Sequence, residues 1–100
     1  MMKSKKYYSN LIVKIKKAGL RPTRQRIALA ELLFKPDQRH VTADILYREA
    51  LKAKVPISIA TIYNTLHKFT DVKLLKEVAV DSHRTYFDTN TEEHYHFFYK

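Results

Sequence analysis

The sequence contains no cysteine and no tryptophan, and only one glycine and three prolines occur among its 100 residues. Without cysteine the chain has no disulfide, no thiolate metal site and no cysteine nucleophile. With a single glycine it has no glycine-rich loop of the kind that cradles phosphate groups. No apolar run reaches the roughly 18 residues that span a membrane, and the N-terminus lacks the apolar core of a secretory signal. We therefore expect a cytoplasmic protein without a membrane partner.

The residues that are present indicate one small folded domain. Hydrophobic residues make up 45% of the chain, which is enough for a core at this length. A metal site of histidine and carboxylate could activate water, but the sequence shows no clear nucleophile–base arrangement. We expect no enzymatic activity.

The net charge of +9 is concentrated at one end of the chain. Residues 1–30 hold nine lysines and arginines and no acidic residue, whereas residues 31–100 hold ten basic and ten acidic residues. A localised excess of this kind is typical of a surface that contacts the phosphates of nucleic acid. A solubilising basic tail and a membrane-surface helix are the alternatives.

Two helices are predicted in the first part of the chain. The first covers about residues 4–18 and ends at Gly19, where a left-handed residue would close the helix. The second begins after Thr23, a suitable N-cap, and ends before Pro36. Both carry apolar residues at helical spacing, so each is expected to bury one face.

The segment HVTADILYREALKAKVPISIATIYNTLHKF predicts a helix-turn-helix. Thr42 and Ser58 are N-cap candidates, and each follows an apolar residue that can pack against another one turn into the helix. The two helices are expected over about residues 42–53 and 59–70. In the second, Ile59, Ile62, Leu66 and Phe69 repeat at core spacing.

The other face of this second helix combines small, hydroxylic, aromatic, amide and basic side chains. Such groups can reach base edges in the major groove. The candidate reading residues are Ala60, Thr61, Tyr63, Asn64 and Lys68. An ordinary solvent-exposed face is the alternative interpretation.

The stretch LLKEVAVDSHRTYFD predicts two short strands, about residues 75–80 and 84–88. A hairpin after a helix-turn-helix is a wing, so the predicted fold is mainly α with a small β hairpin, a winged helix-turn-helix. Because the turn lacks glycine, we expect a loop longer than two residues. His83 and Arg84 near its tip are candidate contacts for a phosphate or the minor groove.

The C-terminal stretch DTNTEEHYHFFYK contains a candidate metal site. His94 and His96 share one face of an extended segment, so both imidazoles can bind one ion. Asp88 ends the preceding strand, and the polar TNTEE stretch is long enough to turn back toward it. Two nitrogens and a carboxylate suit Fe(II), Mn(II) or Zn(II). A surface loop with incidental histidines is the alternative.

Similarity to a known family is carried by four segments: AGLRPTRQRIALAELL, RHVTADILYREA, SIATIYNTLHKF and TYFDTNTEEHYHFF. They resemble the ferric uptake regulator family of metal-dependent bacterial repressors, from about Lys17 to Phe98. The S-x-A-T-x-Y-x-T-L helix combined with D-x5-H-x-H is the most specific part. The alanine-rich second helix, the DTNT loop and the missing cysteines are most similar to the iron response regulator branch, whereas HYH is also similar to the peroxide-sensing branch.

The resemblance implies a winged-helix DNA-binding domain over residues 1–88, then a hinge at 89–100 and the start of a dimerisation domain that this chain lacks. It implies repression of iron, haem or oxidative-stress genes from AT-rich inverted repeats of double-stranded DNA, by proteins that are homodimers at full length. The second helix of the helix-turn-helix would enter the major groove, and Arg21 the minor groove. The candidate DNA contacts are Lys17, Arg21, Thr23, Arg24, Ser58, Ala60, Thr61, Tyr63, Asn64, Lys68 and Arg84.

The resemblance also implies a regulatory metal site at the seam between two domains. His40, in RHVTA, matches a family ligand, and Asp88, His94 and His96 match three more. Fe(II) or Mn(II) is the expected ion, with Zn(II) as a substitute in vitro. The Cys-x-x-Cys structural zinc site and cysteine-ligated haem are excluded by the missing cysteines. Tyr95 replaces the middle histidine of the iron response branch, where haem is one proposed effector, so haem is a weaker expectation than a metal ion.

Two other functions fit the same residues. A truncated paralogue would bind DNA without metal sensing, and its DNA affinity would not respond to Mn(II). A protein-interaction module would use the winged-helix fold without DNA, and neutralising Arg21 or Lys17 would leave its partner binding intact.

Overall fold

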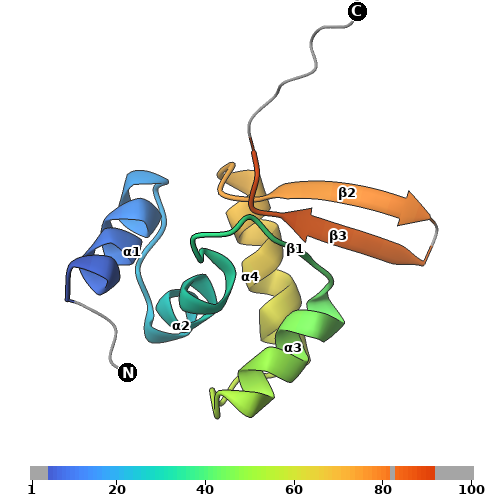
Figure 1. Cartoon of the computed structure of the whole chain (residues 1–100), viewed down its shortest axis with the longest axis horizontal. Coiled ribbons are helices and arrows are strands. Elements are labelled where there is room, and N and C mark those ends of the chain that lie inside the picture. The colour runs from blue at the N-terminus through green and yellow to red at the C-terminus, as the bar shows by residue number, and fades with distance from the viewer. Residues whose placement is uncertain (1–4, 82, 92–100) are drawn as a thin grey trace, which may run out of the picture.

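The computed structural model describes residues 5–81 and 83–91 (Figure 1). His94 and His96 lie outside the described residues. The elements are α1 (Lys5–Lys17), α2 (Arg24–Leu33), β1 (His40–Val41), α3 (Ala43–Lys52), α4 (Ile59–Asp71), β2 (Lys76–Asp81) and β3 (Arg84–Asp88). The predicted mainly α fold with a β hairpin is confirmed, and each predicted helix and strand is present within a few residues of its expected bounds.

The helices begin and end where local side chains satisfy their terminal backbone groups. Thr23, Thr42 and Ser58 are the N-caps of α2, α3 and α4, and each hydroxyl oxygen accepts a hydrogen bond from the backbone N–H three residues later. At the end of α1, Gly19 adopts φ +93°. The N–H of Leu20 donates to the carbonyl of Ile15 at 3.1 Å, as the left-handed ending requires.

The sheet has three strands in the order β1-β3-β2, all antiparallel, so β3 lies in the middle. Strand β1 was not predicted, because two residues are too few to show a two-residue period. It exists because β3 offers a free edge, on which His40 pairs with Asp88 and Val41 with Phe87.

The wing turn is shorter than expected. Strand β2 runs to Asp81 and β3 begins at Arg84, and these two residues are paired, so the expected loop of more than two residues was wrong. The carboxylate of Asp81 accepts hydrogen bonds from the backbone N–H groups of His83 and Arg84, at 2.8 and 2.9 Å. Such an Asx-type contact stabilises a turn that has no glycine.

Helix α4 runs through the middle of the molecule, with α1 and α2 on one side of it and the hairpin of β2 and β3 on the other (Figure 1). Ile62, Leu66 and Phe69 are fully buried in the core, as predicted, whereas Ile59 is only partly buried at the first turn. The Phe69 ring packs on Phe34 with centroids 6.0 Å apart. Among the described residues, no helix has both the length and the apolar character needed to cross a membrane.

Candidate nucleic-acid interface and metal-ligand pair

The exposed side of α4 carries the predicted reading residues. Ala60, Tyr63, Asn64 and Lys68 are exposed and Thr61 is partly buried. Tyr63 keeps 47% of its surface accessible although it is a large aromatic residue. A single exposed aromatic side chain is common on protein surfaces, so the feature of interest is the position of Tyr63 beside Asn64 on the exposed face of α4.

The N-terminus of α4 is held rigid by its cap. The Ser58 hydroxyl accepts from the N–H of Thr61 at 3.1 Å and donates to the Thr61 hydroxyl at 3.0 Å. Ser58 and Thr61, which are both candidate DNA contacts, therefore take part in the N-cap of α4 in this structure.

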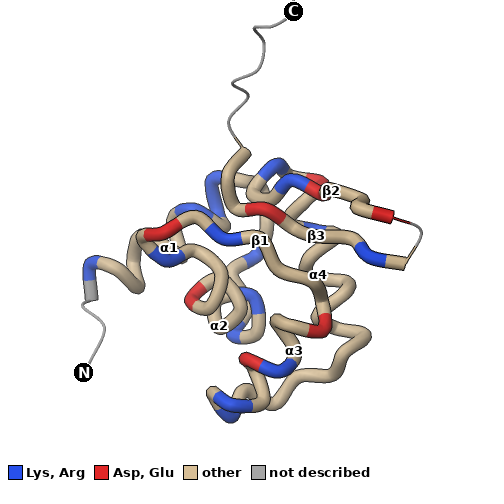
Figure 2. The backbone as a smooth tube through the Cα atoms, turned by 45° about the vertical axis from the view of Figure 1, so that its right-hand side comes forward, with Lys and Arg blue, Asp and Glu red and all other residues tan. Residues whose placement is uncertain are grey.

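The basic residues at the start of α2 lie next to the helix-turn-helix. The Gln25 side chain donates to the carbonyl of Pro56, in the turn before α4, at 3.4 Å. This contact brings the exposed neighbours Arg21 and Arg24 to the side of the molecule where α4 begins. Basic positions outnumber acidic ones around α1 and α2 (Figure 2). The charge excess of the sequence and the exposed face of α4 thus border one another.

Some of the basic residues have structural partners. The ammonium group of Lys14 lies 4.7 Å above the Phe34 ring. The guanidinium of Arg26 donates to the carbonyl of Arg21 at 3.0 Å and so fixes the connection between α1 and α2. Lys17 and Arg24 are exposed. The charge excess is therefore only partly available to a partner.

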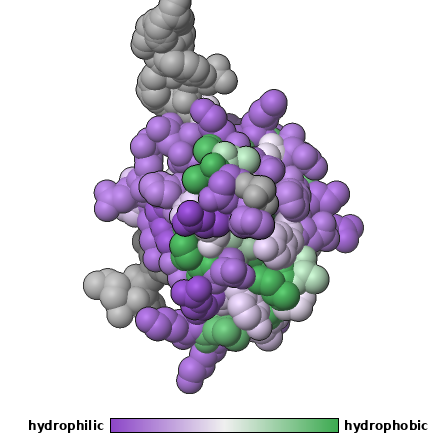
Figure 3. All heavy atoms as spheres, turned by 90° about the vertical axis from the view of Figure 1, so that its right-hand side faces the viewer, coloured by the Kyte–Doolittle hydropathy of each residue, from purple (hydrophilic) through white to green (hydrophobic). Residues whose placement is uncertain are grey.

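A groove of about 460 Å³ lies between the first turn of α3, the middle of α4 and the wing. Tyr63 and His67 line it from α4, and Arg84 lines it from the wing, where its guanidinium is 3.3 Å from the Asp81 carboxylate. His67 also faces Glu77 at 3.8 Å and meets the Phe87 ring edge-on. Of these contacts, that of the buried Phe87 ring packs the wing beside α4. Seen from the wing end, the surface is mainly hydrophilic with separate small hydrophobic patches (Figure 3).

Two of the four predicted metal ligands are brought together by the sheet. His40 and Asp88 are direct partners across β1 and β3, so their side chains emerge on the same face. Val41 and Phe87, one position along, are 1% and 2% exposed and point inward. His40 and Asp88 therefore lie on the outer face of the sheet, away from α4, and both line a shallow cavity of about 290 Å³.

The surroundings of this pair fit a divalent ion only in part. The His40 ring meets Tyr86 edge-on at 5.5 Å, and one oxygen of Asp88 accepts from the N–H of Asn90 at 2.8 Å. One imidazole and one carboxylate are suitable donors for Fe(II), Mn(II) or Zn(II). Within residues 5–81 and 83–91 no group of three or more potential ligands occurs. The described part of the chain therefore supplies half of the predicted donor set.

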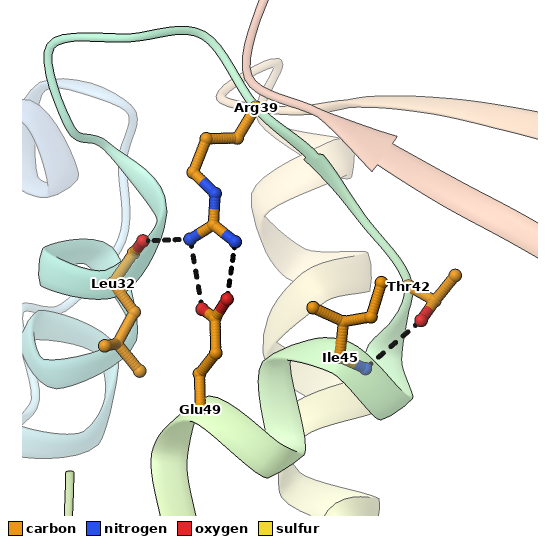
Figure 4. Close-up of polar contacts among 5 residues, drawn as sticks. All are labelled: Leu32, Arg39, Thr42, Ile45 and Glu49. Atoms are coloured by element: carbon orange, nitrogen blue, oxygen red, sulfur yellow. Dashed lines mark hydrogen bonds and ion pairs between the residues drawn. The ribbon is translucent and has the colours of Figure 1, made fainter. Parts of the chain in front are cut away.

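A partly buried fork lies directly beside this pair and was not expected from the sequence. The guanidinium of Arg39 binds both carboxylate oxygens of Glu49 on α3, at 3.0 and 2.6 Å, and donates to the carbonyl of Leu32 on α2 at 2.7 Å (Figure 4). The hydrogen-bonded carboxylate raises the pKa of Arg39 above its usual value, although burial acts to lower it. No spacing in the sequence indicates this contact, because an arginine ten residues before a glutamate is common in any chain.

Known proteins resemble this chain in both sequence and fold. The sequence profile of the ferric uptake regulator family matches residues 17–100. The chain belongs to the ferric uptake regulator family. Among its relatives is the peroxide-responsive repressor PerR of Staphylococcus epidermidis, which is 44% identical over 86 residues, 85% of this chain and 56% of the relative. The chain therefore spans about half the length of this relative.

Solved structures of the family share the fold. The ferric uptake regulator of Vibrio cholerae matches with a TM-score of 0.76 and 28% identity, over 83% of this chain and 63% of that one. The ferric uptake regulator of Pseudomonas aeruginosa, solved with manganese, matches with a TM-score of 0.71 and 28% identity, over 76% of this chain and 57% of that one. The winged helix-turn-helix prediction is thereby confirmed. The relative quoted above is a peroxide-responsive repressor, so the assignment to the iron response regulator branch stays a prediction.

Proposed function

We propose that this chain is the DNA-binding part of a metal-responsive transcriptional repressor. Residues 1–88 would form the DNA-binding domain, and residues 89–100 the hinge toward a dimerisation domain. Two features support DNA binding: membership of a family whose relatives are repressors, and the exposed face of α4. The observation that carries the proposal is the exposure of Tyr63 and Asn64 on a capped helix whose opposite face is buried.

In this proposal α4 enters the major groove. The amide of Asn64 can pair with an adenine edge, and the ring of Tyr63 can contact a thymine methyl group, which favours AT-rich sites. Lys17, Arg21 and Arg24 would contact phosphates or the minor groove on one side of α4, and Arg84 on the other. Thr23, Ser58, Ala60, Thr61 and Lys68 would complete the interface.

The regulatory part of the proposal concerns the outer face of the sheet. His40 and Asp88 would hold one side of a divalent ion, Fe(II) or Mn(II), and His94 and His96 would supply the other side. A bound ion would crosslink β1 and β3 to the segment that follows β3. Support comes from the direct pairing of His40 with Asp88 and from the relative solved with manganese. Homodimerisation is proposed for the full-length protein.

The test is a titration of the chain onto a labelled AT-rich inverted repeat and onto a scrambled duplex. It is carried out at several salt concentrations, with Mn(II) or with a chelator. We expect preference for the repeat, tighter binding with Mn(II), and affinity that falls steeply with salt because phosphate contacts release counterions. Equal binding to both duplexes would reject a sequence-specific repressor. Preference that ignores Mn(II) would favour the DNA-binding paralogue without metal sensing, and no DNA binding at all would favour a protein-interaction module.

A further inference from the structure

Strand β1 is short, and it is anchored by the buried Val41 side chain and by the residues before and after it. It has two residues, and in the part of the chain that the structure describes it pairs with β3 alone. After it, Thr42 caps α3 by accepting from the N–H of Ile45 at 3.1 Å (Figure 4). Before it, Arg39 is the last residue of the connection from α2. The position of β1, and with it that of His40, therefore depends on how Arg39 and Thr42, the residues that flank the strand, are fixed.

Arg39 fixes the N-terminal end of β1 through both its side chain and its backbone. Its guanidinium joins the Leu32 carbonyl of α2 to the Glu49 carboxylate of α3. Its backbone N–H donates to the Thr89 hydroxyl at 2.9 Å, and its carbonyl accepts from the Thr89 N–H at 2.9 Å. Thr89 directly follows Asp88. One residue thus contacts α2, α3 and the residue that leaves β3.

We propose that Arg39 is a positioning residue, whose fork with Glu49 holds His40 opposite Asp88 and ties this metal-ligand pair to the helix-turn-helix. The inference rests on the proposed function, because it concerns regulation at the same pair. Glu49 lies on α3, the helix directly before the turn into α4. A shift of β1 against α3 would therefore move the ligand pair relative to the reading helix.

The geometry of the fork is specific for arginine. The planar guanidinium donates to both oxygens of Glu49 and still reaches the Leu32 carbonyl, whereas an ammonium group is a single point of charge that cannot match this arrangement. The side chains of Arg39 and Glu49 are 22% and 32% exposed, so solvent screens their charges only in part. Replacement by lysine keeps the charge and removes the fork.

The experiment compares the wild-type chain with Arg39→Lys and Glu49→Gln. Arg48→Lys is the matched control, since Arg48 is an exposed arginine of α3 outside the fork. Mn(II) affinity is measured by competition with a chelator, and far-UV circular dichroism checks that each variant is folded. We expect both fork variants to bind Mn(II) about tenfold more weakly, the lower end of the effect of losing a residue that orients a ligand. Arg48→Lys should bind as the wild type does.

A second readout requires no metal. Amide hydrogen exchange at Thr89 reports the contact between Arg39 and the residue after β3. We expect exchange at Thr89 to be faster in both fork variants and unchanged in Arg48→Lys, while amides in the middle of α4 keep their protection.

The outcomes separate this inference from the function on which it rests. Wild-type binding of Mn(II) with unchanged affinity in folded Arg39→Lys and Glu49→Gln would overturn the positioning role alone. So would slower folding or lower thermal stability without any change in Mn(II) affinity or Thr89 exchange, because that is a purely structural effect. Failure of the wild type to bind Mn(II) would instead reject the metal site, and the inference with it.

Discussion

The two candidate sites of this protein are built in different ways. The exposed face of α4 comes from one continuous stretch, residues 60–68, and a single cap at Ser58 orients it. The metal-ligand pair comes from positions 40 and 88, which meet only because β1 adds to the edge of β3. A surface on one helix persists as long as the helix does. A pair across a two-residue strand depends on every element that places the strand, so we expect it to be more easily lost.

The test of this comparison with the largest expected effect removes the side chain that lies beneath both sites. Phe87 is 2% exposed, pairs with Val41 and meets His67 of α4 edge-on. We expect Phe87→Ala to lower the free energy of unfolding by about 3–5 kcal/mol, because it leaves a large cavity. Urea unfolding followed by circular dichroism measures this loss.

Phe87→Leu is the control for this change. It keeps most of the buried volume, so we expect a loss of less than about 1.5 kcal/mol. If Phe87→Ala were as stable as Phe87→Leu, the sheet would not be packed on α4 through this ring. In that case the two sites would be independent of each other.

The second test affects the α4 face alone. Asn64 is exposed on α4, so Asn64→Ala should leave stability nearly unchanged. We expect it to reduce discrimination between an AT-rich repeat and a scrambled duplex by about 1–3 kcal/mol, because the amide no longer pairs with a base. Fluorescence anisotropy with both duplexes measures this difference.

Asn10→Ala, at an exposed asparagine of α1, is the matched control and should not change the discrimination. Mn(II) affinity should be the same in Asn64→Ala as in the wild type. Unchanged discrimination in Asn64→Ala would show that the Asn64 amide does not read a base.

The third test acts at the border between the two sites. Thr42 directly follows β1 and caps α3. We expect Thr42→Ala to lower the free energy of unfolding by about 1 kcal/mol, because the cap is lost; such changes cost about 0.5–2 kcal/mol. Thermal unfolding measures it.

Thr42→Ser keeps the hydroxyl and should restore most of the stability. If the alanine and serine variants unfolded at the same temperature, the hydroxyl would not contribute through the cap, and the border between β1 and α3 would be held by other contacts.

The smallest effect is expected where α4 leads into the wing. Lys73 adopts φ +69°, a left-handed conformation that favours glycine. Its N–H donates to the carbonyl of Thr70, and the next N–H reaches the carbonyl of Phe69. We expect Lys73→Gly to raise the free energy of unfolding by up to about 1 kcal/mol, because the strain of a side chain in this region is removed.

Lys52→Gly, inside the last turn of α3, is the control with the opposite sign, since glycine within a helix costs about 0.5–1 kcal/mol. A loss of stability in both variants would mean that the left-handed ending of α4 is not strained. Neither change should alter Mn(II) binding or DNA discrimination.

Sequence reasoning was most successful where the interactions are local. The caps at Thr23, Thr42 and Ser58 and the helix ending at Gly19 were all predicted, since each depends on residues within one turn. The strand at β1 was missed. Its two residues show no pattern of their own, and only the edge of β3 makes them a strand.

Among the site residues, the exposed face of α4 followed from helical spacing, whereas His40 was identified only through family resemblance. Nothing in the local sequence distinguishes it from a histidine before a helix cap. Arg39 and His67 were not identified at all, since their partners Glu49 and Glu77 are found only in the folded chain. The wing turn was mispredicted because the carboxylate of Asp81 performs the role expected of a glycine.

The sequence by itself determined where the helices begin and end, which face of α4 is apolar, and where the positive charge is concentrated. These properties follow from interactions within one or two turns and from simple composition. Only the tertiary structure decided that His40 faces Asp88, that Arg39 joins α2 to α3 beside them, and that the wing is held against α4. Such contacts join residues of different structural elements, and their geometry exists only once the core has brought the elements together.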